Sequence, residues 1–201
     1  MDARDLLIEE HSAVHSTAVG GNKASMAERT FGGLTDDQMR VRPREDLNSL
    51  AWLMWHIARA EDIMANLVLN GRDQVLDSGW LPRLKIARRD FGIGMTKPEV
   101  SELTAAVDIA ALRDYRDAVG RRTQEIVGAY GQQDWEGNIE AAAVGRAGAL
   151  GCFGDRTDAL VKLFTGRPRR AVLTGIVVIH SAMHMGEGAT VRAAGGFGTG
   201  I

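Results

Sequence analysis

The sequence lacks the features that mark several large classes of protein. Cys152 is the single cysteine among 201 residues, which excludes an internal disulfide framework and favours a reducing compartment. The net charge is only −2, so there is no basic footprint of the kind that nucleic-acid-binding proteins carry. Hydrophobic residues make up 45% and charged residues 25%, as in ordinary soluble globular proteins. We therefore expect a globular protein whose main partner is not nucleic acid.

Segments for membrane insertion or secretion are also missing from the pattern. The most apolar window, around residues 171–179, is too short to span a bilayer. The first eleven residues, MDARDLLIEEH, are acidic and lack the basic-then-apolar order of a signal peptide. No stretch shows sustained strand alternation, and the periodicity is helical almost throughout. We expect one all-α domain over residues 1–201, located in the cytoplasm, with no membrane partner.

Helical periodicity and its breaks predict a four-helix bundle. The four long helices are expected over about 5–31, 47–69, 108–130 and 171–194. We expect a possible break at Gly20 and Gly21 in the first helix, and Asp46 or Asn48 as the cap of the second. The glycine-rich tail, 195–201, is expected to be mobile.

The connection over 72–97, between the second and third helices, is unusually long for a compact bundle. Connections of this length are often lids or binding loops. This one carries four basic residues close together, and the alternative is a solvated basic face on a short helix. The basic residues are Arg83, Lys85, Arg88 and Arg89.

Two histidines interrupt the most apolar face of the last helix. His180 and His184 are four residues apart, so they lie about 40° apart around the helix axis, and Glu187 falls within about 60° of them. A pair of histidines at this spacing can hold one metal ion with two nitrogens. The alternative is a pair of hydrogen-bonded histidines in the core or at its rim.

A third histidine, His56, lies on the apolar face of the second helix. If the second and fourth helices are neighbours, His56 meets His180 and His184. Three neutral nitrogens would hold one divalent ion and leave positions open for water or substrate, as in catalytic sites. Nitrogen ligands suit zinc, nickel, iron or copper, and the sequence does not choose among them.

The pair His11 and His15 competes with this constellation because it has the same spacing. Its close neighbours are polar, so we expect a solvated or rim position rather than a metal site. His11 points with Leu7 and Val14 and is a candidate lining residue. The polar neighbours are Glu9, Glu10, Ser12 and Ser16.

The motifs WLMWHIARAED (52–62) and HSAMHMGE (180–187) resemble the DinB-like superfamily. The stretch DFGIGMTKPEV (90–100) is similar to a connection in some relatives, and the resemblance spans about 6–194. It implies a four-helix bundle in up-up-down-down order that binds a divalent metal through His56, His180 and His184. The superfamily includes mycothiol-dependent maleylpyruvate isomerase and bacillithiol or mycothiol S-transferases, and the resemblance also implies a homodimer.

The resemblance favours an enzyme that uses the ion to activate a low-molecular-weight thiol, mycothiol or bacillithiol, against a small electrophile. Glu187 is expected to orient a histidine, to move a proton or to ligate the ion. Trp52 and Trp55 are candidate pocket walls, and the basic residues of the long connection are candidate ligands for substrate carboxylates. Cys152 has no histidine near it in sequence, so the nucleophile should come from outside the protein.

Two other functions remain open at this point. A metal-dependent hydrolase would use the same ligands with bound water in place of the thiol. A non-catalytic metal-binding protein, for example a sensor in a stress response, would use the ion as a structural support, and chelation would then unfold it.

Overall fold

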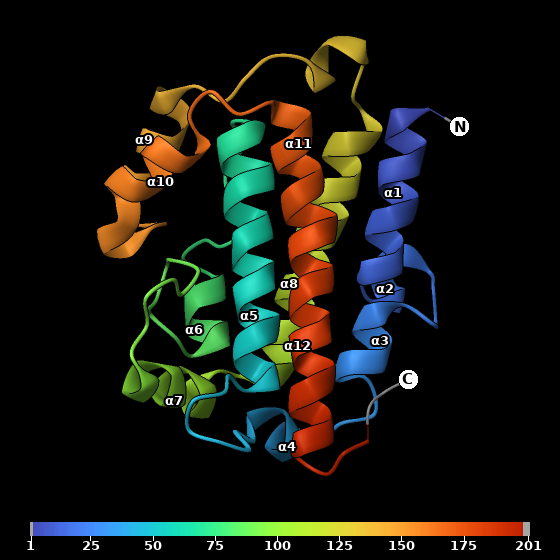
Figure 1. The fold of residues 1–201 in the computed structure, drawn as a ribbon, viewed down its shortest axis with the longest axis vertical. Helices are drawn as coiled ribbons and strands as arrows, with labels where there is room; N and C mark the ends of the chain where they lie inside the picture. The colour runs from blue at the N-terminus through green and yellow to red at the C-terminus, as the bar shows by residue number, and fades with distance from the viewer. Residues whose placement is uncertain (1, 199–201) are drawn as a thin grey trace.

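The computed structural model describes residues 2–198, and these form helices with no named strand among them (Figure 1). The predicted all-α fold is confirmed. Four long helical segments lie side by side and form the bundle. They are α1 (Ala3–Val14); α5 (Leu50–Glu61) with η1 (Asp62–Leu69); α8 (Ile109–Gly128); and α11 (Arg169–Thr174) with η4 (Gly175–His180) and α12 (Ser181–Ala194).

The segment α5–η1 is the buried centre of the bundle, since every residue from Leu50 to Leu69 is buried. A helix buried on all sides is apolar over most of its surface, and its polar side chains need partners, as Arg59 and Asp62 have in each other at 3.0 Å. Two hydrophobic clusters meet along it. One surrounds its first half and packs mainly on α8, and the other surrounds η1 and packs on the last third of the chain. His56 and Glu61 lie on α5 close to the level where these clusters meet.

The directions of the four segments differ from the order that the resemblance implied. Contacts show that α1 runs antiparallel to α8, and that α5 runs antiparallel to α12 (Figure 1). The order is therefore up-down-down-up, and the expected up-up-down-down order is wrong. The long connection between α5 and α8 returns the chain to the end where α5 began, so these two helices run parallel. The contacts are Ser12–Gln124 and Ser16–Asp117 for the first pair, and Asn48–Glu187 and His56–His180 for the second.

The first predicted helix, over 5–31, is divided into α1, α2 (Thr17–Gly20) and α3 (Met26–Phe31). The chain breaks at His15 and Ser16, whose backbones are extended, and again at Gly20–Gly21, where we expected a break: α2 ends at Gly20 and Gly21 is left-handed. A short helix, α4 (Asp36–Arg40), follows before the chain enters α5. The break allows the His15 side chain to turn into the bundle.

The cap of α5 is Ser49, not Asp46 or Asn48 as predicted. The Ser49 hydroxyl accepts a hydrogen bond from the Trp52 amide at 3.0 Å and shares another with Thr104 at 2.8 Å. Serine caps helices as well as aspartate and asparagine do. Leu50 is fully buried and begins the helix, so Ser49 takes the cap position. The Asn48 side chain is thereby free to reach the last helix.

The long connection holds α6 (Trp80–Leu84) and α7 (Lys97–Ala106), and Thr96 and Glu99 form a capping box at the start of α7. Three of its four basic side chains pair with carboxylates, and Arg89 is exposed without such a pair among the described residues. This agrees with the alternative of a solvated basic face, and it does not support a role for them in binding substrate carboxylates. The pairs are Arg83–Asp114, Lys85–Asp108 and Arg88–Asp90, each at 3.0 Å, with Glu99 also on Arg88.

Between α8 and α11 the chain leaves the bundle and forms η2 (Gln132–Trp135), α9 (Ala141–Ala149), η3 (Gly154–Arg156) and α10 (Thr157–Phe164). Figure 1 shows α9 and α10 beside the upper end of α5. Helix α10 is amphipathic, and its buried residue Leu160 packs into the hydrophobic cluster around η1. Cys152 is buried here, and the Gln74 amide donates to its sulfur at 3.3 Å.

Residues 195–198 of the glycine-rich tail turn back on α12, where the Phe197 amide donates to the Arg192 carbonyl at 3.0 Å. Residues 199–201 of the tail lie outside the described residues, so the mobility that we expect for them stays a prediction.

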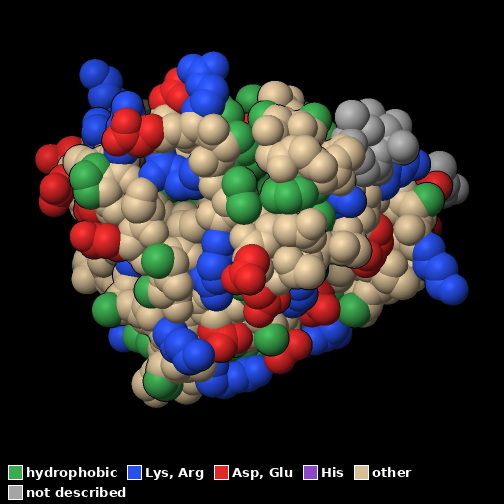
Figure 2. All heavy atoms as spheres, turned by 90° about the horizontal axis from the view of Figure 1, so that it is seen from below, with side chains coloured by type: hydrophobic (Ala, Val, Ile, Leu, Met, Phe, Trp, Pro, Cys, Tyr) green, Lys and Arg blue, Asp and Glu red, His purple; other side chains and the backbone are tan. Residues whose placement is uncertain are grey.

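The surface carries charges of both signs. On the face seen in Figure 2, lysine and arginine side chains are interspersed with aspartate and glutamate, without a field of one sign. None of the helices in the described part of the chain is both long enough and apolar enough to cross a bilayer.

Candidate metal centre

The structure brings together the three histidines that the sequence singled out. His56 comes from α5, His180 ends η4 and His184 lies one turn further along α12. Each offers one ring nitrogen, and these three atoms lie within 4.8 Å of one another. The Nε2 atoms of His56 and His180 are 3.1 Å apart. Ligands of a tetrahedral zinc ion, bound at about 2.0–2.1 Å, would be separated by about 3.3 Å.

Hydrogen bonds on the far sides of two rings decide which nitrogens face the centre. The Nδ1–H of His56 donates to the carbonyl of Phe91. The Nδ1–H of His184 donates to Glu187 Oε2 at 2.8 Å. A neutral imidazole with its proton on Nδ1 has its lone pair on Nε2. Both rings therefore turn a metal-binding lone pair inward, and the partners that hold them are of the kinds found behind ligating histidines.

Burial keeps the centre neutral. It lowers the pKa of His56 to about 4, and the hydrogen bond to Phe91 offsets this only in part. It also lowers the pKa of His180 to about 3, with the neighbouring His56 and His184 adding to the effect. Both rings are uncharged at neutral pH, as a metal ligand must be. The Nδ1 atom of His180 is buried and has no hydrogen-bond partner among the described residues.

Glu187 lies at the open edge of the centre, as the sequence suggested. Its hydrogen bond from His184 lowers its pKa, and the Asn48 amide donates to its other oxygen at 2.9 Å. The carboxylate side chain is 34% exposed, and that of His184 is 22% exposed. An ionised carboxylate in contact with solvent and with a histidine of the centre can orient that ring and can accept a proton.

The two tryptophans have different roles. Trp52 stacks on His56, with ring centroids 4.7 Å apart and planes 9° from parallel, and its Nε1 lies 3.2 Å from the sulfur of Met95. Trp52 is thus a wall of the centre. Trp55 is fully buried and belongs to the core. Gly92 lies directly over both rings in a left-handed conformation, and a Cβ there would come within 3.0 Å of each, so the long connection closes this side of the centre.

The sequence did not reveal Asn48 or the Phe91 carbonyl as partners of the centre. A backbone carbonyl has no signature in the side-chain pattern. Asn48 was considered only as a cap, because its position just before a helix is the common one for that role.

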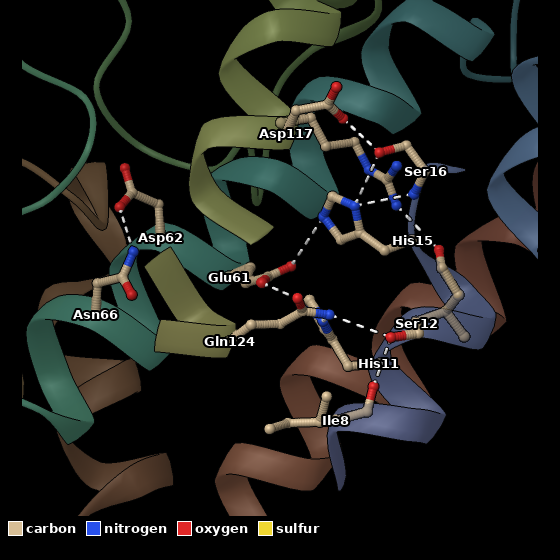
Figure 3. Close-up of polar contacts among 12 residues, drawn as sticks. Ile8, His11, Ser12, His15, Ser16, Glu61, Asp62, Asn66, Asp117 and Gln124 are labelled. Atoms are coloured by element: carbon tan, nitrogen blue, oxygen red, sulfur yellow. Dashed lines mark hydrogen bonds and ion pairs between the residues drawn. The ribbon is translucent and has the colours of Figure 1, made fainter. Parts of the chain in front are cut away.

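The prediction for the second histidine pair was wrong. His11 and His15 are each 1% exposed, and they lie against Glu61, which is 3% exposed. Figure 3 shows the three side chains pointing toward one another from α1 and α5. His11 Nε2 lies 2.9 Å from one oxygen of Glu61, and His15 Nε2 lies 3.9 Å from the other. The polar neighbours of this pair do not indicate exposure. The chain breaks after α1 and Gly120 has no side chain, so the His15 ring fits inside the bundle.

In this second cluster the ring protons face the centre. The Ser16 amide donates to His15 Nδ1 at 2.9 Å, so the neutral ring carries its proton on Nε2, toward Glu61. Gln124 lies 3.5 Å from His11 Nδ1, and the Nε2–H of His11 donates to Glu61. Both rings thus present N–H groups rather than lone pairs. Although the spacing of the three side chains would admit an ion, this arrangement supports a buried carboxylate.

Charges around the second cluster agree with that assignment. Burial would raise the pKa of Glu61, but the interactions with His11, Thr123 and Arg116 together outweigh it, and the pKa is lowered. Burial and the nearby Arg116 hold the pKa of His15 well below its usual range. Arg116 is itself buried, and its guanidinium donates to the Val14 carbonyl at 3.0 Å. A fixed cation beside the cluster opposes the binding of a second cation.

The residues at the first centre fit a divalent ion. The donor set is three imidazoles, and hydrogen bonds turn the Nε2 lone pairs of His56 and His184 inward. The Nε2 atoms of His56 and His180 are close enough to share either a proton or a cation. The unpartnered Nδ1 of His180 is one difference from the usual pattern, in which every ligating histidine has a partner behind it.

Comparisons with known proteins bear on this centre. A family model of the DinB superfamily matches residues 23–187, which include the three histidines and Glu187 but neither His11 nor His15. None of the curated proteins matches the sequence. A solved structure of a conserved protein from Enterococcus faecalis is similar over 96% of this chain and 97% of its own, with a TM-score of 0.68 and 20% identity. At that identity the likeness concerns the fold alone.

Proposed function

This chain belongs to the DinB superfamily, and on that premise we propose that it is a metal-dependent enzyme that transfers or adds a low-molecular-weight thiol to a small electrophile. The observation that carries the proposal is the convergence of His56, His180 and His184, the first two as neutral rings, beside an ionised, part-exposed Glu187. Zinc, nickel and iron suit such a set. A divalent ion there would supply positive charge that three neutral ligands leave uncompensated, which lowers the pKa of a thiol or water at the site.

The roles of the protein side chains follow from their positions. The thiol loses its proton to Glu187, its sulfur forms a bond to the electrophilic carbon, and the leaving group departs with its electron pair and takes up the proton. In an isomerisation the same sulfur adds and is later eliminated. Trp52 and Gly92 exclude water from one side of the centre. Cys152 is buried with a raised pKa caused by that burial, so it does not compete as nucleophile.

The thiol is the least constrained part of the proposal. Mycothiol and bacillithiol are favoured by the resemblance to thiol transferases and to maleylpyruvate isomerase. The same charge on the ion would activate water, so a metal-dependent hydrolase is the alternative, and a non-catalytic metal-binding protein is the third possibility.

The test offers the metal-loaded protein a model electrophile with mycothiol, bacillithiol, glutathione or coenzyme A in turn. We expect one of these thiols to react at least about a hundredfold faster than with the matched His56→Ala protein, as for loss of an essential electrostatic group. Glu187→Gln, assayed at a metal concentration that saturates it, should lose rate, with a shifted pH profile. If no thiol reacts while esters or amides are hydrolysed, the hydrolase is correct. If neither reaction occurs, the protein is a non-catalytic metal-binding protein.

We also propose that the protein is a cytoplasmic homodimer. A single free cysteine, as Cys152 is, is typical of proteins in a reducing compartment. Leu6 on α1 and Ile179 on η4 are 46% and 54% exposed and line one apolar groove, which a two-fold partner would cover. A monomer mass in light scattering would contradict the dimer.

A further inference from the structure

A second groove leads to the metal centre from the side of α10. It is open to solvent, encloses about 530 Å³ and runs between the end of α10 and the α11–η4 segment. Ligand sites in proteins commonly enclose about 300–1,000 Å³. The walls of this groove are apolar, and they include Phe164, Pro168, Val172 and Ile176.

His180 also lines this groove. Its ring places the Nε2 atom 3.1 Å from His56, at the candidate metal centre. Its Nδ1 atom is buried and has no hydrogen-bond partner among the described residues. His180 also ends η4, a π-helical stretch, and such stretches are frequent at functional sites. A molecule in the groove would therefore touch a ring of the centre.

The mouth of the groove is basic. Over residues 157–170 there are four basic side chains, Lys162, Arg167, Arg169 and Arg170, and one acidic side chain, Asp158. Arg169 donates to the Leu69 carbonyl, and Arg170 lies 3.7 Å from Glu136. Arg167 lines the groove, and its guanidinium makes no hydrogen bond or ion pair with other described residues. A guanidinium in this position is suited to a carboxylate or another anion.

We propose that this groove binds the electrophilic substrate, a small molecule with an apolar body and an anionic group. The body lies against Phe164, Val172 and Ile176, and the anion pairs with Arg167. What happens to the molecule after it binds rests on the proposed function, but the binding does not. The electrophilic carbon would be held at the His180 end, where the thiol attacks.

Gly175 allows the groove to be filled without disturbing the core. It lines the groove, has ordinary helical dihedral angles, and a Cβ built on it meets no atom within 4 Å. Gly175→Leu therefore projects a side chain into the groove. The matched control is Gly186→Leu on the same continuous helix, where a Cβ also meets no atom within 4 Å and the groove is not reached. Both changes replace a helical glycine by a good helix former.

The measurement is calorimetric titration of the purified, metal-loaded protein with 4-phenylbutyrate and with the uncharged 4-phenylbutan-1-ol. We expect saturable binding of both, with the acid favoured about two- to fivefold, as an exposed ion pair contributes. Gly175→Leu should weaken both ligands at least about tenfold, and Gly186→Leu should change neither. Arg167→Gln, at an exposed position that folding does not depend on, should remove the preference for the acid.

Wild-type affinity in Gly175→Leu, or no saturable binding by the wild type, would overturn the proposal. An unchanged preference for the acid in Arg167→Gln would also overturn it. Failure of the thiol assay with binding intact contradicts only the proposed function. If Gly175→Leu transfers thiol to an aryl carboxylate electrophile with the same KM as the wild type, the groove proposal is contradicted and the proposed function is not.

Discussion

Two histidine clusters lie close together in this bundle, and they differ in where each ring carries its proton. Both contain two histidines four residues apart in the sequence and a third side chain from α5, His56 in one cluster and Glu61 in the other. At the first, a carbonyl and a carboxylate accept the Nδ1 protons, and lone pairs face inward. At the second, a backbone amide donates to His15, and N–H groups face inward. The groups behind the rings therefore distinguish a metal centre from a buried carboxylate.

The two clusters also differ in access and charge. Glu187 and His184 keep contact with solvent, as a reaction site requires, whereas the three side chains of the second cluster are enclosed. Arg116 stands beside the second cluster, and the exposed arginine of the groove stands near the first. One arrangement is suited to exchange with solvent and the other to holding α1 against α5.

The largest expected difference between the clusters is in metal content. The purified protein should contain about one divalent ion per chain, held by the three histidines of the first cluster. His184→Ala should lose nearly all of it, because two of the three neutral ligands cannot hold the ion against buffer. The double variant His11→Ala with His15→Ala should keep it. Elemental analysis of folded protein measures both.

Equal metal content in His184→Ala and the wild type would remove His184 from the centre. Loss of the ion from the double variant would mean that the second cluster binds it, and that the assignment of ring protons there is wrong.

The next difference is in stability. Glu61→Gln should lower the free energy of unfolding by about 3 kcal/mol or more, because it removes the negative charge that compensates buried Arg116 and that faces the His11 and His15 rings at 2.9 and 3.9 Å. Glu187→Gln, at a half-exposed position, should change stability by less than about 1 kcal/mol and lower metal affinity about ten- to a hundredfold. Urea unfolding of chelated protein measures the stabilities, and metal titration measures the affinities. If Glu61→Gln lost metal affinity and Glu187→Gln lost stability, the second cluster would be the metal centre and the first a structural one.

The sequence predicted the first cluster better than the second for a physical reason. His56, His180 and His184 each lie on a face that is otherwise apolar, and helical spacing alone shows this. The burial of His15 depends on a helix break and on Gly120 of a distant helix, and neither can be found by counting along 11–15. Local polarity was a poor guide because Ser12 and Ser16 satisfy their hydroxyls within the protein.

The fold was predicted to a similar degree. The four long helices and the amphipathic α10 follow from periodicity, but the directions of the helices do not, because these depend on how far the connection over 70–108 carries the chain. The cap at Ser49 could not be separated from Asp46 and Asn48 by residue type. The assignment of the whole chain to one domain stays a prediction.

A smaller effect separates the packing of His15 from its charge. A Cβ on Gly120 would lie 2.6 Å from Cε1 of His15, whereas one on Gly128 of the same helix would meet nothing within 4 Å. Gly120→Ala should therefore cost about 1–3 kcal/mol of stability through overpacking, and Gly128→Ala should add a few tenths to about 1 kcal/mol. Thermal unfolding compares the pair. A stabilised Gly120→Ala protein would show that the His15 ring lies elsewhere.

The smallest effect is a pH dependence that isolates His15. Its pKa is held well below 6.5 by burial and by Arg116, so the folded protein leaves it neutral in mild acid. The unfolded chain binds a proton there as the pH falls through about 6.5, and the free energy of unfolding then falls by about 1.4 kcal/mol per pH unit. His56 and His180 behave alike in chelated protein, since their pKa values are lowered to about 4 and about 3. All three therefore contribute between about pH 6.5 and about pH 5.5, above the range where carboxylates titrate.

Substitution of His15 separates its contribution from those of His56 and His180. An ion at the first cluster keeps His56 and His180 unprotonated in the folded state, but the unfolded chain still protonates them, so the ion does not remove their part of the slope. Between about pH 7.5 and about pH 5.5, His15→Gln should therefore reduce the fall in the free energy of unfolding by about 1.4 kcal/mol, with or without metal. Urea unfolding of the wild type and of His15→Gln at the two pH values gives the four numbers needed. If His15→Gln keeps the full slope, the folded protein protonates His15 as readily as the unfolded chain does. The ring would then be a cationic partner of Glu61, and the contrast between the two clusters would rest on access to solvent alone.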